Sequence, residues 1–398
     1  MGSTNEPGNH ALIFGASGIT GWAITNALLS DYPSPDAFSK VTALTNRPLS
    51  KEQAQWPESS KLQLVSGIDL LMDGGQQGLE KEMQSKIGDM STVSHVYFFS
   101  YVMDLDPAKE ISINVTLLER AVTAVENLSK NLKYVVLPTG TKAYGVHLID
   151  KFPFTPPLAE NLPRIPEPYA SEMFYYNQLD MLASLAKGKQ WTWCEVRPDV
   201  VVGFVPNNNV YCLAQALALY LSCYAAVAGP GASVEFPGTA ASWTILSNDS
   251  SQDILAKFSI WASLHPSETG GQAFNVADNA RPSSWSEKWP VICEFFGLKG
   301  VGPPPNGGSG PQPGEYLVEH VETWRELEQK HGLQKGRVEG NERSFGGFPY
   351  FIMTMFNFDR QMDMSKLHET WGDEKVETDA KGAWWTAFER FRRAKIIP

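Results

Sequence analysis

The segment MFYYNQLD, residues 173–180, places two adjacent tyrosines, Tyr175 and Tyr176, at the start of a predicted helix. A tyrosine hydroxyl can donate a hydrogen bond to a substrate oxygen, and a nearby lysine strengthens that donor. In a common arrangement the lysine follows the tyrosine four residues later, but no tyrosine of this chain has a lysine at that position. A tyrosine and lysine pair would therefore be assembled from distant parts of the fold.

The lysine that could complete such a pair is Lys142, in the segment LPTGTKAYG. It directly follows the fifth predicted strand, at the carboxyl edge of a parallel sheet, where ligands of open α/β folds bind. A solvated loop lysine is the alternative that position alone leaves open.

The first predicted strand, HALIF, runs into GASGITG, whose glycines are spaced by three residues at the start of a helix. Glycines in this position let the backbone turn sharply and approach a pyrophosphate, whose charge lies among the free N–H groups of the helix N-terminus. The second strand follows about twenty residues later, as a nucleotide-binding turn requires. The residues of this turn that we expect to bind the cofactor are Gly15, Ser17, Gly18, Ile19 and Gly21.

The second strand ends in LTNRP, which places Asn46 and Arg47 where the adenosine ribose is recognised. An acidic residue there would repel a 2′-phosphate, whereas a guanidinium group attracts it. NADPH is therefore the expected cofactor, although Arg47 could also be a solvated surface residue. Asp69, after the third strand, is expected to face the adenine.

The elements that position these residues alternate between short apolar runs and helical patterns over the first two hundred residues, which is typical of βαβ units and a parallel sheet. The predicted strands are 10–14, 40–46, 61–67, 95–102, 133–139 and 192–204, and the predicted helices lie near 19–30, 75–88, 107–129 and 171–187. The expected fold class is a Rossmann-type doubly wound sheet, with the nucleotide-binding domain at 1–205.

The second half of the chain, 206–398, reads as a mainly helical substrate cap. One run within it, AFNVAD at 273–278, is predicted to return to the sheet as a seventh strand. The Pro/Gly stretch at 300–314 is predicted to be an irregular surface loop or lid.

Composition narrows the class of partner. The net charge of −11 is spread along the chain without a basic tract that could follow a phosphate backbone, so nucleic acid is not expected. The four cysteines form no C-x-x-C pair and lie far from histidines, which indicates neither a metal site nor disulfides. The N-terminus shows no secretion or anchor pattern, and a cytoplasmic protein is expected.

The stretch 210–229 has no charged residue over twenty positions, which is long enough to span a bilayer. Its Gln215, its Ser222 and the lack of flanking Lys or Arg favour instead a helix buried in the protein or in a subunit interface. A homodimer through this helix is one expectation.

The chain resembles the PRISE group of short-chain dehydrogenases/reductases, which is named for progesterone 5β-reductase and iridoid synthase. The resemblance covers nearly the whole chain and rests on the order of several motifs. These are GASGITG, TGTK, ENLPR, MFYYNQLD, VRPDVVVGF, FPG, IWASLHP, AFNVADNARPSSWSEKWPVICEFFGL and AKIIP. Ala143 departs from the pattern, because the family usually has a histidine after the lysine.

The resemblance implies that Tyr175 and Lys142 are catalytic and act on the carbonyl of an α,β-unsaturated substrate while NADPH delivers hydride. Such an addition makes an enolate, to which a phenol can donate a hydrogen bond. Tyr176 points about 100° away along the helix and is expected in the core. Val201 would lie near the nicotinamide, and Asn114 resembles a structural asparagine.

An apolar substrate, a hydrophobic enone or enal, is expected to meet aromatic residues of the cap. Tyr144, Trp243 and Phe351 are the candidates for this pocket, and each could equally be ordinary core. Three other functions remain open from the sequence. They are a carbonyl reductase acting by 1,2-addition, a non-redox cyclase or isomerase that polarises a carbonyl with the same pair, and a redox-sensing binding protein.

Overall fold

The computed structural model describes residues 8–345 and 347–398. Its centre is a seven-stranded sheet in the order β10-β6-β5-β4-β1-β2-β3, and every neighbouring pair is parallel. The strands are β1 (Asn9–Phe14), β2 (Phe38–Thr45), β3 (Leu62–Ser66), β4 (His95–Phe98), β5 (Tyr134–Pro138), β6 (Thr192–Arg197) and β10 (Gln272–Asn275). The strand order reverses between β1 and β4, which opens a ligand crevice at their carboxyl ends. The predicted Rossmann-type fold is confirmed.

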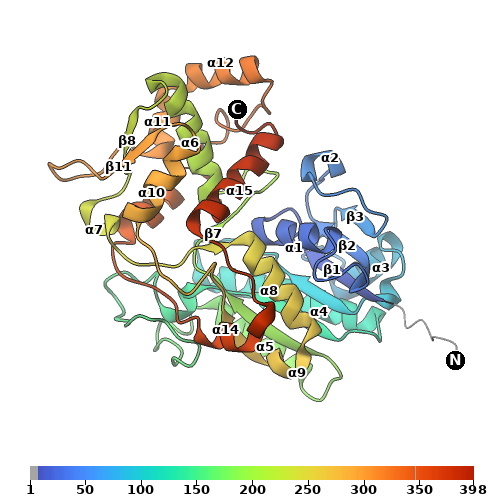
Figure 1. The fold of residues 1–398 in the computed structure, drawn as a ribbon. Helices are drawn as coiled ribbons and strands as arrows, with labels where there is room; N and C mark the ends of the chain where they lie inside the picture. The colour runs from blue at the N-terminus through green and yellow to red at the C-terminus, as the bar shows by residue number, and fades with distance from the viewer. Residues whose placement is uncertain (1–7, 346) are drawn as a thin grey trace.

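Helices cover both faces of the sheet (Figure 1). One face is covered by α1 (Ile19–Leu29) packed on α8 (Gln252–Leu264), and the other by α3 (Gly75–Lys86), α4 (Pro107–Leu128) and α5 (Phe174–Ala186). Side chains alternate along β1, so Ala11 and Ile13 join the core with α1 and α8, whereas Leu12 and Phe14 join the core with α3 and α4. Both faces must therefore be apolar, which explains the continuous hydrophobic runs of these strands.

Most of the remaining helices of the second half gather at one side of the sheet (Figure 1). They are α6 (Leu213–Ala228), α7 (Ala240–Trp243), α10 (Trp285–Glu294), α11 (Pro313–Glu319), α12 (Val321–His331), α13 (Gly347–Tyr350) and α15 (Ala380–Arg393). Shorter elements are α2 (Lys51–Ala54), α9 (Pro266–Thr269), α14 (Ser365–Trp371), β7 (Val201–Val202) with β9 (Ser250–Ser251), and β8 (Ser233–Glu235) with β11 (Lys299–Val301). Short 3₁₀ or π segments are η1 (Met90–Thr92), η3 (Glu342–Ser344), η4 (Phe351–Met355) and η5 (Gly372–Glu374). The domain boundary near residue 205 stays a prediction, and α8 and β10 belong to the sheet layer rather than to the cap.

Two predicted strands are shorter in the structure. The run 192–204 is not one strand: β6 ends at Arg197, and the chain pairs again only at β7, in a separate small sheet. Pro198 explains the break, because it has no N–H to donate to a sheet. The run 95–102 ends at Phe98, after which the chain leaves the sheet edge.

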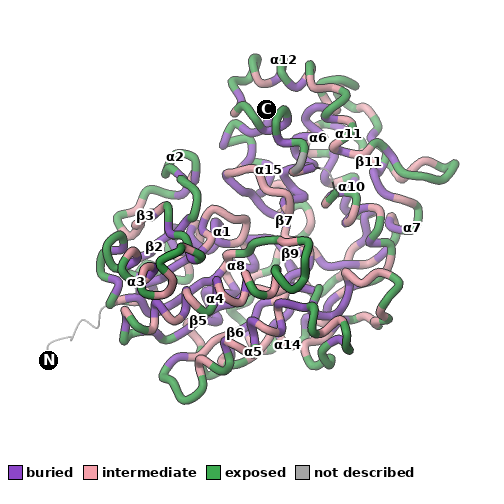
Figure 2. The backbone as a smooth tube through the Cα atoms, turned by 180° about the vertical axis from the view of Figure 1, so that it is seen from behind, coloured by how far each residue is buried: buried purple, intermediate pink, exposed green. Residues whose placement is uncertain are grey.

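The uncharged stretch 210–229 contains α6, whose residues 213–223 are all buried. Its neighbours are α11, α12 and α15 of the same chain, and Figure 2 shows the helix enclosed in the cap. The prediction of a buried helix is confirmed. Because the chain itself covers most of this helix, little apolar surface is left on it for a partner, and the homodimer stays a prediction. Within the described residues no helix is long and apolar enough to cross a membrane.

The Pro/Gly stretch 300–314 is irregular over most of its length but not at its ends. Its first residues, Gly300 and Val301, pair with β8 as part of β11, and Pro313 begins α11. A proline is well tolerated at the first position of a helix, so it starts α11 rather than breaking it. Between these ends residues 305–309 are exposed.

Candidate active site

The glycine turn after β1 forms a cradle that only glycines fit. Gly15 has φ +78°, and a Cβ on it would lie 2.5 Å from the carbonyl oxygen of Phe99. A Cβ on Gly21 would overlap the carbonyl group of Gly15. The loop after β4 and the start of α1 can therefore approach the turn closely. This cradle fits the pyrophosphate of a dinucleotide.

The N-terminus of α1 is free to bind an anion. Its cap residue is Gly18, which supplies no side-chain acceptor, and its first turn carries no acidic residue. Ser17 is half-buried beside it, and Ile19 packs against the core cluster as the first residue of the helix. The Gly18 N–H donates to the Gly15 carbonyl oxygen at 2.9 Å, and the N–H groups at the start of the helix itself can bind a phosphate.

The residues expected at the adenosine end follow strands β2 and β3, and their contact with a nucleotide stays a prediction. Asn46 and Arg47 directly follow β2 and are exposed, and no ion pair of Arg47 is found among the described residues. Asp69 is exposed after β3, and one of its carboxylate oxygens accepts a hydrogen bond of 2.9 Å from the Leu71 N–H. No partner of its second oxygen is found within residues 8–345 and 347–398. Val201, half-buried in β7, pairs with Ser250.

Lys142 lies in the 3₁₀ turn η2 (Thr141–Tyr144), directly beyond β5. Although its side chain reaches solvent, the protein around it displaces enough water to lower the pKa of the ammonium group, and the Glu110 carboxylate opposes that shift. No hydrogen bond or ion pair of this group is found within the described part of the chain. The ammonium group is therefore free to act on a ligand.

Tyr175 lies in the first turn of α5 with its hydroxyl over the same segment. Gly140 lies two residues before Lys142, and a Cβ placed on Gly140 would lie 3.7 Å from the hydroxyl oxygen of Tyr175. The side chain is half-buried, and burial raises the pKa of its phenol, as do the carboxylates of Glu110 and Glu195. The structure thus brings Tyr175 and the Lys142 turn to one edge of the sheet.

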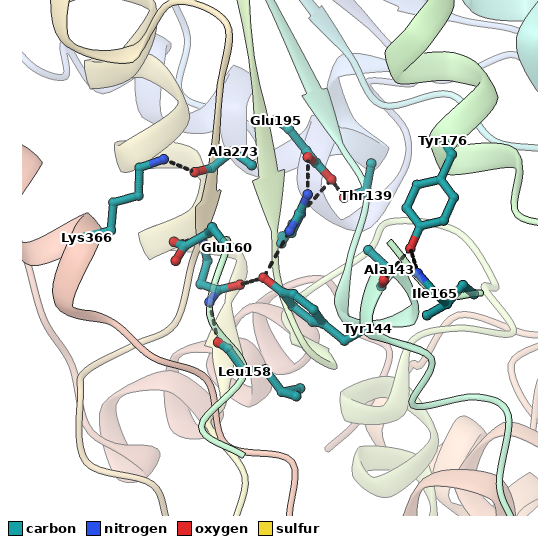
Figure 3. Close-up of polar contacts among 12 residues, drawn as sticks. Thr139, Ala143, Tyr144, Leu158, Glu160, Ile165, Tyr176, Glu195, Ala273 and Lys366 are labelled. Atoms are coloured by element: carbon teal, nitrogen blue, oxygen red, sulfur yellow. Dashed lines mark hydrogen bonds and ion pairs between the residues drawn. The ribbon is translucent and has the colours of Figure 1, made fainter. Parts of the chain in front are cut away.

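Tyr176 is buried, as predicted, and its hydroxyl makes two hydrogen bonds. It donates a hydrogen bond of 2.6 Å to the carbonyl oxygen of Ala143 and accepts one of 3.1 Å from the Ile165 N–H (Figure 3). The Tyr175 hydroxyl, in contrast, has no hydrogen-bond partner among the residues that the structure describes. Tyr176 therefore fastens α5 to the lysine turn, and Tyr175 is left free for a ligand.

Tyr144 is buried in a polar network rather than facing an open pocket. Its hydroxyl donates to Asn275 Oδ1 at 2.7 Å and accepts from Arg197 at 3.1 Å, and Arg197 pairs with the buried Glu195 (Figure 3). Burial raises the pKa of Tyr144 to about 12, with Arg197 opposing. This network ties β10 and β6 to η2, and the contacts favour a structural role for Tyr144 over the predicted substrate contact.

A second tie joins the cap to the lysine turn. Asp199, just beyond β6, accepts hydrogen bonds from Thr141 Oγ1 at 3.0 Å and from Arg360 Nε at 2.9 Å. Both charged side chains are almost fully buried, at 3% and 2% exposure. Separating such a pair would leave each charge buried without a partner, which costs free energy. The pair therefore holds the segment around Arg360 against the lysine turn.

A row of aromatic rings extends from Tyr175 to the cap. Phe174 lies 4.5 Å from Tyr175 and 5.4 Å from Tyr101, measured between ring centroids. Tyr101 lies 5.9 Å from Tyr211, which lies 5.5 Å from Phe348 of α13. This row forms an apolar wall beside the phenol, and the sequence reasoning missed most of it because its members are far apart in the chain.

The predicted pocket residues Trp243 and Phe351 lie elsewhere in the cap. Trp243 packs on Phe236 with centroids 5.1 Å apart, and Phe351 packs on Phe356 at 4.6 Å. Both are half-buried. No aromatic contact found among the described residues joins them to the row at Tyr175, so their role in substrate binding stays a prediction.

Asn114 organises the loop that carries Tyr101. Its side chain accepts from the Val102 N–H at 3.0 Å and donates to the Val102 carbonyl at 2.7 Å. Its own carbonyl accepts a hydrogen bond of 2.8 Å from Gln178 of α5. The side chain is fully buried, which confirms the structural asparagine that the sequence predicted.

The family model described as the PRISE-like Rossmann-fold domain matches residues 11–398. The chain belongs to this family. It is thus an oxidoreductase of the short-chain dehydrogenase/reductase superfamily with a nucleotide-binding Rossmann fold. The resemblance seen in the motifs is confirmed over nearly the whole chain.

Three relatives match along most of their length. The short chain dehydrogenase ausT of Aspergillus calidoustus is 34% identical and the match covers 98% of this chain and 94% of that protein. The 3-oxo-Δ(4,5)-steroid 5-β-reductase of Arabidopsis thaliana is 26% identical, with 98% and 93% covered. An (S)-8-oxocitronellyl enol synthase of Nepeta cataria is 27% identical over 83% of this chain and 78% of that protein.

Solved structures share the fold at low identity. The enzyme WbmH of Bordetella bronchiseptica in complex with NAD⁺ superimposes with a TM-score of 0.58 at 14% identity, covering 96% of this chain and 98% of that one. The epimerase Mth375 of Methanothermobacter thermautotrophicus gives 0.61 at 13% identity, with 97% and 93% covered. At these identities the similarity supports the fold alone.

Proposed function

We propose that this protein is an NADPH-dependent reductase of α,β-unsaturated carbonyl compounds. The observation that carries the proposal is the hydroxyl of Tyr175, which lies over Gly140 in the segment that leads to Lys142. Neither this hydroxyl nor the Lys142 ammonium group has a polar partner among the described residues. A phenol in this position can donate a hydrogen bond to a carbonyl oxygen that gains negative charge during the reaction. The ammonium group of the same turn, placed near the bound carbonyl, would make the phenol a better donor.

The residues of the chain would have distinct roles in cofactor binding and in catalysis. The glycine cradle and the N-terminus of α1 hold the pyrophosphate, and Arg47 attracts the 2′-phosphate. NADPH, when bound, supplies the hydride. Tyr175 holds the substrate oxygen and stabilises the enolate, while Lys142 contributes positive potential. Tyr176 and the Asp199–Arg360 pair keep the turn between them in place.

The substrate class follows from the aromatic row and from the relatives. A wall formed by Phe174, Tyr101 and Tyr211 is suited to a hydrophobic enone or enal, such as a terpenoid, steroid or polyketide. The names of two relatives, a 3-oxo-Δ(4,5)-steroid 5-β-reductase and an (S)-8-oxocitronellyl enol synthase, agree with a conjugated carbonyl substrate.

The test is turnover by the purified protein with NADPH and a panel of enones, enals and saturated ketones. NADPH loss is followed by absorbance and the product by mass spectrometry. A gain of two hydrogens at the alkene is the expected result. Reduction of saturated ketones alone would instead indicate 1,2-addition, and a product of unchanged mass without NADPH loss would indicate an isomerase or cyclase; either result would reject the proposal.

A further inference from the structure

Helices α4 and α5 lie side by side in their N-terminal halves. The two helices pack together, and Gln178 of α5 donates a hydrogen bond of 2.8 Å to the carbonyl of Asn114 in α4. Glu110 lies four residues before Asn114, and Tyr175 lies three residues before Gln178. Residues at these spacings share a helix face, and both helices run away from the same sheet edge. Glu110 and Tyr175 are therefore neighbours across the helix pair.

Tyr101 fixes the Glu110 side chain in this position. Its hydroxyl donates a hydrogen bond of 2.5 Å to Glu110 Oε1, and its ring stacks on Phe174, the residue before Tyr175. The loop of Tyr101 is itself held by Asn114 through Val102. No ion pair of Glu110 is found among the residues that the structure describes, so no direct partner neutralises its charge.

We propose that Glu110 is the counter-ion of Lys142 across the catalytic crevice, and that Tyr101 holds it there as a positioning residue. This inference deepens the proposed function, because it concerns how the lysine of that site keeps its charge. A cation in a crevice that loses water when ligands enter needs a fixed negative charge nearby to remain protonated. Glu110 provides that charge without occupying the ammonium group, which stays free for the substrate side.

The electrostatics of the crevice agree with this arrangement. Burial lowers the pKa of Lys142, and Glu110 raises it. Burial and the charge of Lys142 lower the pKa of His147 to about 4, so this imidazole is neutral at pH 7. Burial also raises the pKa values of Tyr101, Tyr175 and Tyr211, with Glu110 adding to each shift, and these phenols stay protonated. Glu110 therefore acts on the ammonium group of Lys142 and on the three phenols, and Glu195 also acts on Tyr175.

The inference is tested by measuring the pKa of Lys142 directly in the full-length protein. Labelling with acetic anhydride between pH 7 and 11, quantified for the Lys142 peptide by mass spectrometry, reports the free amine without any substrate. The pKa of Lys142 is expected to fall by about 0.5 to 1 unit in Glu110→Gln, because the glutamine keeps an acceptor for Tyr101 but removes the charge. A change smaller than about 0.2 unit would overturn the proposal.

Matched variants separate this effect from general damage. Glu119, exposed on the same helix, is the control, and Glu119→Gln is expected to leave the Lys142 pKa unchanged. Tyr101→Phe and Glu110→Asp keep the charge but lose the hydrogen bond, so each should shift the pKa less than Glu110→Gln. An equal shift in Glu119→Gln, or a larger shift in Tyr101→Phe, would reject the assignment.

The pH dependence of turnover gives a second readout. If charged Lys142 supports the reaction, activity is lost as pH rises through its pKa, and that loss should begin at lower pH in Glu110→Gln by the same amount as in labelling. An unmoved profile in an active variant would overturn the inference. If no enone is turned over, the proposed function fails while the labelling result still decides the counter-ion.

Discussion

The hydroxyl of Tyr176 donates a hydrogen bond of 2.6 Å to the carbonyl oxygen of Ala143, a residue thirty-three positions earlier in the chain. Ala143 directly follows Lys142, and Tyr176 directly follows Tyr175. A single hydrogen bond thus joins the neighbours of both proposed catalytic residues. In the common arrangement the lysine follows the tyrosine four residues later along the chain. Here the two residues come from different segments, which this hydrogen bond holds together.

Tyr176→Phe is expected to reduce stability, because the buried carbonyl of Ala143 and the N–H of Ile165 would lose their partner. The cost of such unpaired buried groups is about 1–3 kcal/mol. Chemical denaturation measures the free energy of unfolding. Turnover should fall less than tenfold, since the reacting groups remain; a variant as stable as the wild type would contradict the role given to this hydroxyl.

Tyr175→Phe should show the opposite pattern. Its hydroxyl has no partner among the described residues, so removing it leaves the fold intact, while loss of one donor to a developing oxyanion costs about 10²–10³ in kcat. Steady-state kinetics with an accepted enone and thermal unfolding, run in parallel on both tyrosine variants, measure the contrast. Equal losses of turnover in the two variants would contradict the assignment within the pair.

Gly21→Ala is expected to weaken nucleotide binding at least tenfold, because the new Cβ would overlap the Gly15 carbonyl and push α1 away from the cradle. Titration of NADPH fluorescence measures the Kd. Gly78→Ala is the matched control, since its Cβ would meet only the flexible end of the Met72 side chain, at 3.3 Å from the methyl and 3.7 Å from the sulfur, and helix α3 should gain stability. Equal NADPH affinity in the two variants would contradict a role of the glycine turn in nucleotide binding.

Arg47→Ala should lower the preference for NADPH over NADH, because the exposed guanidinium, which has no ion pair among the described residues, can pair with the 2′-phosphate. The expected change in the ratio of Kd values is about tenfold, equivalent to one charged hydrogen bond. Asn46→Asp adds a carboxylate beside the same site and should shift the ratio in the same direction by repulsion. An unchanged ratio in both variants would leave the cofactor preference without a structural basis at β2.

Acid should destabilise the fold through a buried histidine. Burial and Lys40 lower the pKa of His10 to about 4, and its ring nitrogens contact Thr42 at 2.8 Å and Thr92 at 2.9 Å. In the unfolded chain a histidine takes up a proton near pH 6.5, so between about 6.5 and 4 the unfolded state binds more protons, and stability is lost as pH falls.

The effect of His10 alone amounts to about 3 kcal/mol when the full window is crossed. Melting curves at pH 7.5 and pH 5 should therefore show a smaller drop in Tm for His10→Gln than for the wild type. A drop of the same size in both proteins would show that this side chain does not control acid stability.

Local signals in the sequence were sufficient for the nucleotide-binding turn and for the position of the lysine. The order of strand, glycines and helix depends on neighbouring residues, so GASGITG could be interpreted without the fold. Lys142 could be assigned to the crevice because parallel strands all end at one edge, which makes its place after β5 informative. The buried helix α6 was also predictable, because its lack of charge extends over four turns.

Other features depended on contacts between distant residues that leave no periodic trace in the chain. The break after Arg197 was missed because an apolar run continued past Pro198, although the proline itself was a usable signal. The network of Tyr144 was invisible, since its partners Arg197 and Asn275 are 53 and 131 residues away.

The sequence by itself determined the parallel sheet, its nucleotide turn and the identities of a phenol and an amine at one edge. Only the tertiary structure decided which polar groups are already paired and which are free. Tyr176 and Tyr175 are adjacent and chemically identical, yet the Tyr176 hydroxyl is bonded to Ala143 while the Tyr175 hydroxyl has no partner in the described part of the chain. That distinction arises because hydrogen bonds form between segments of the chain that are close in space. The contact between α5 and η2 depends on how the helices pack on the whole sheet.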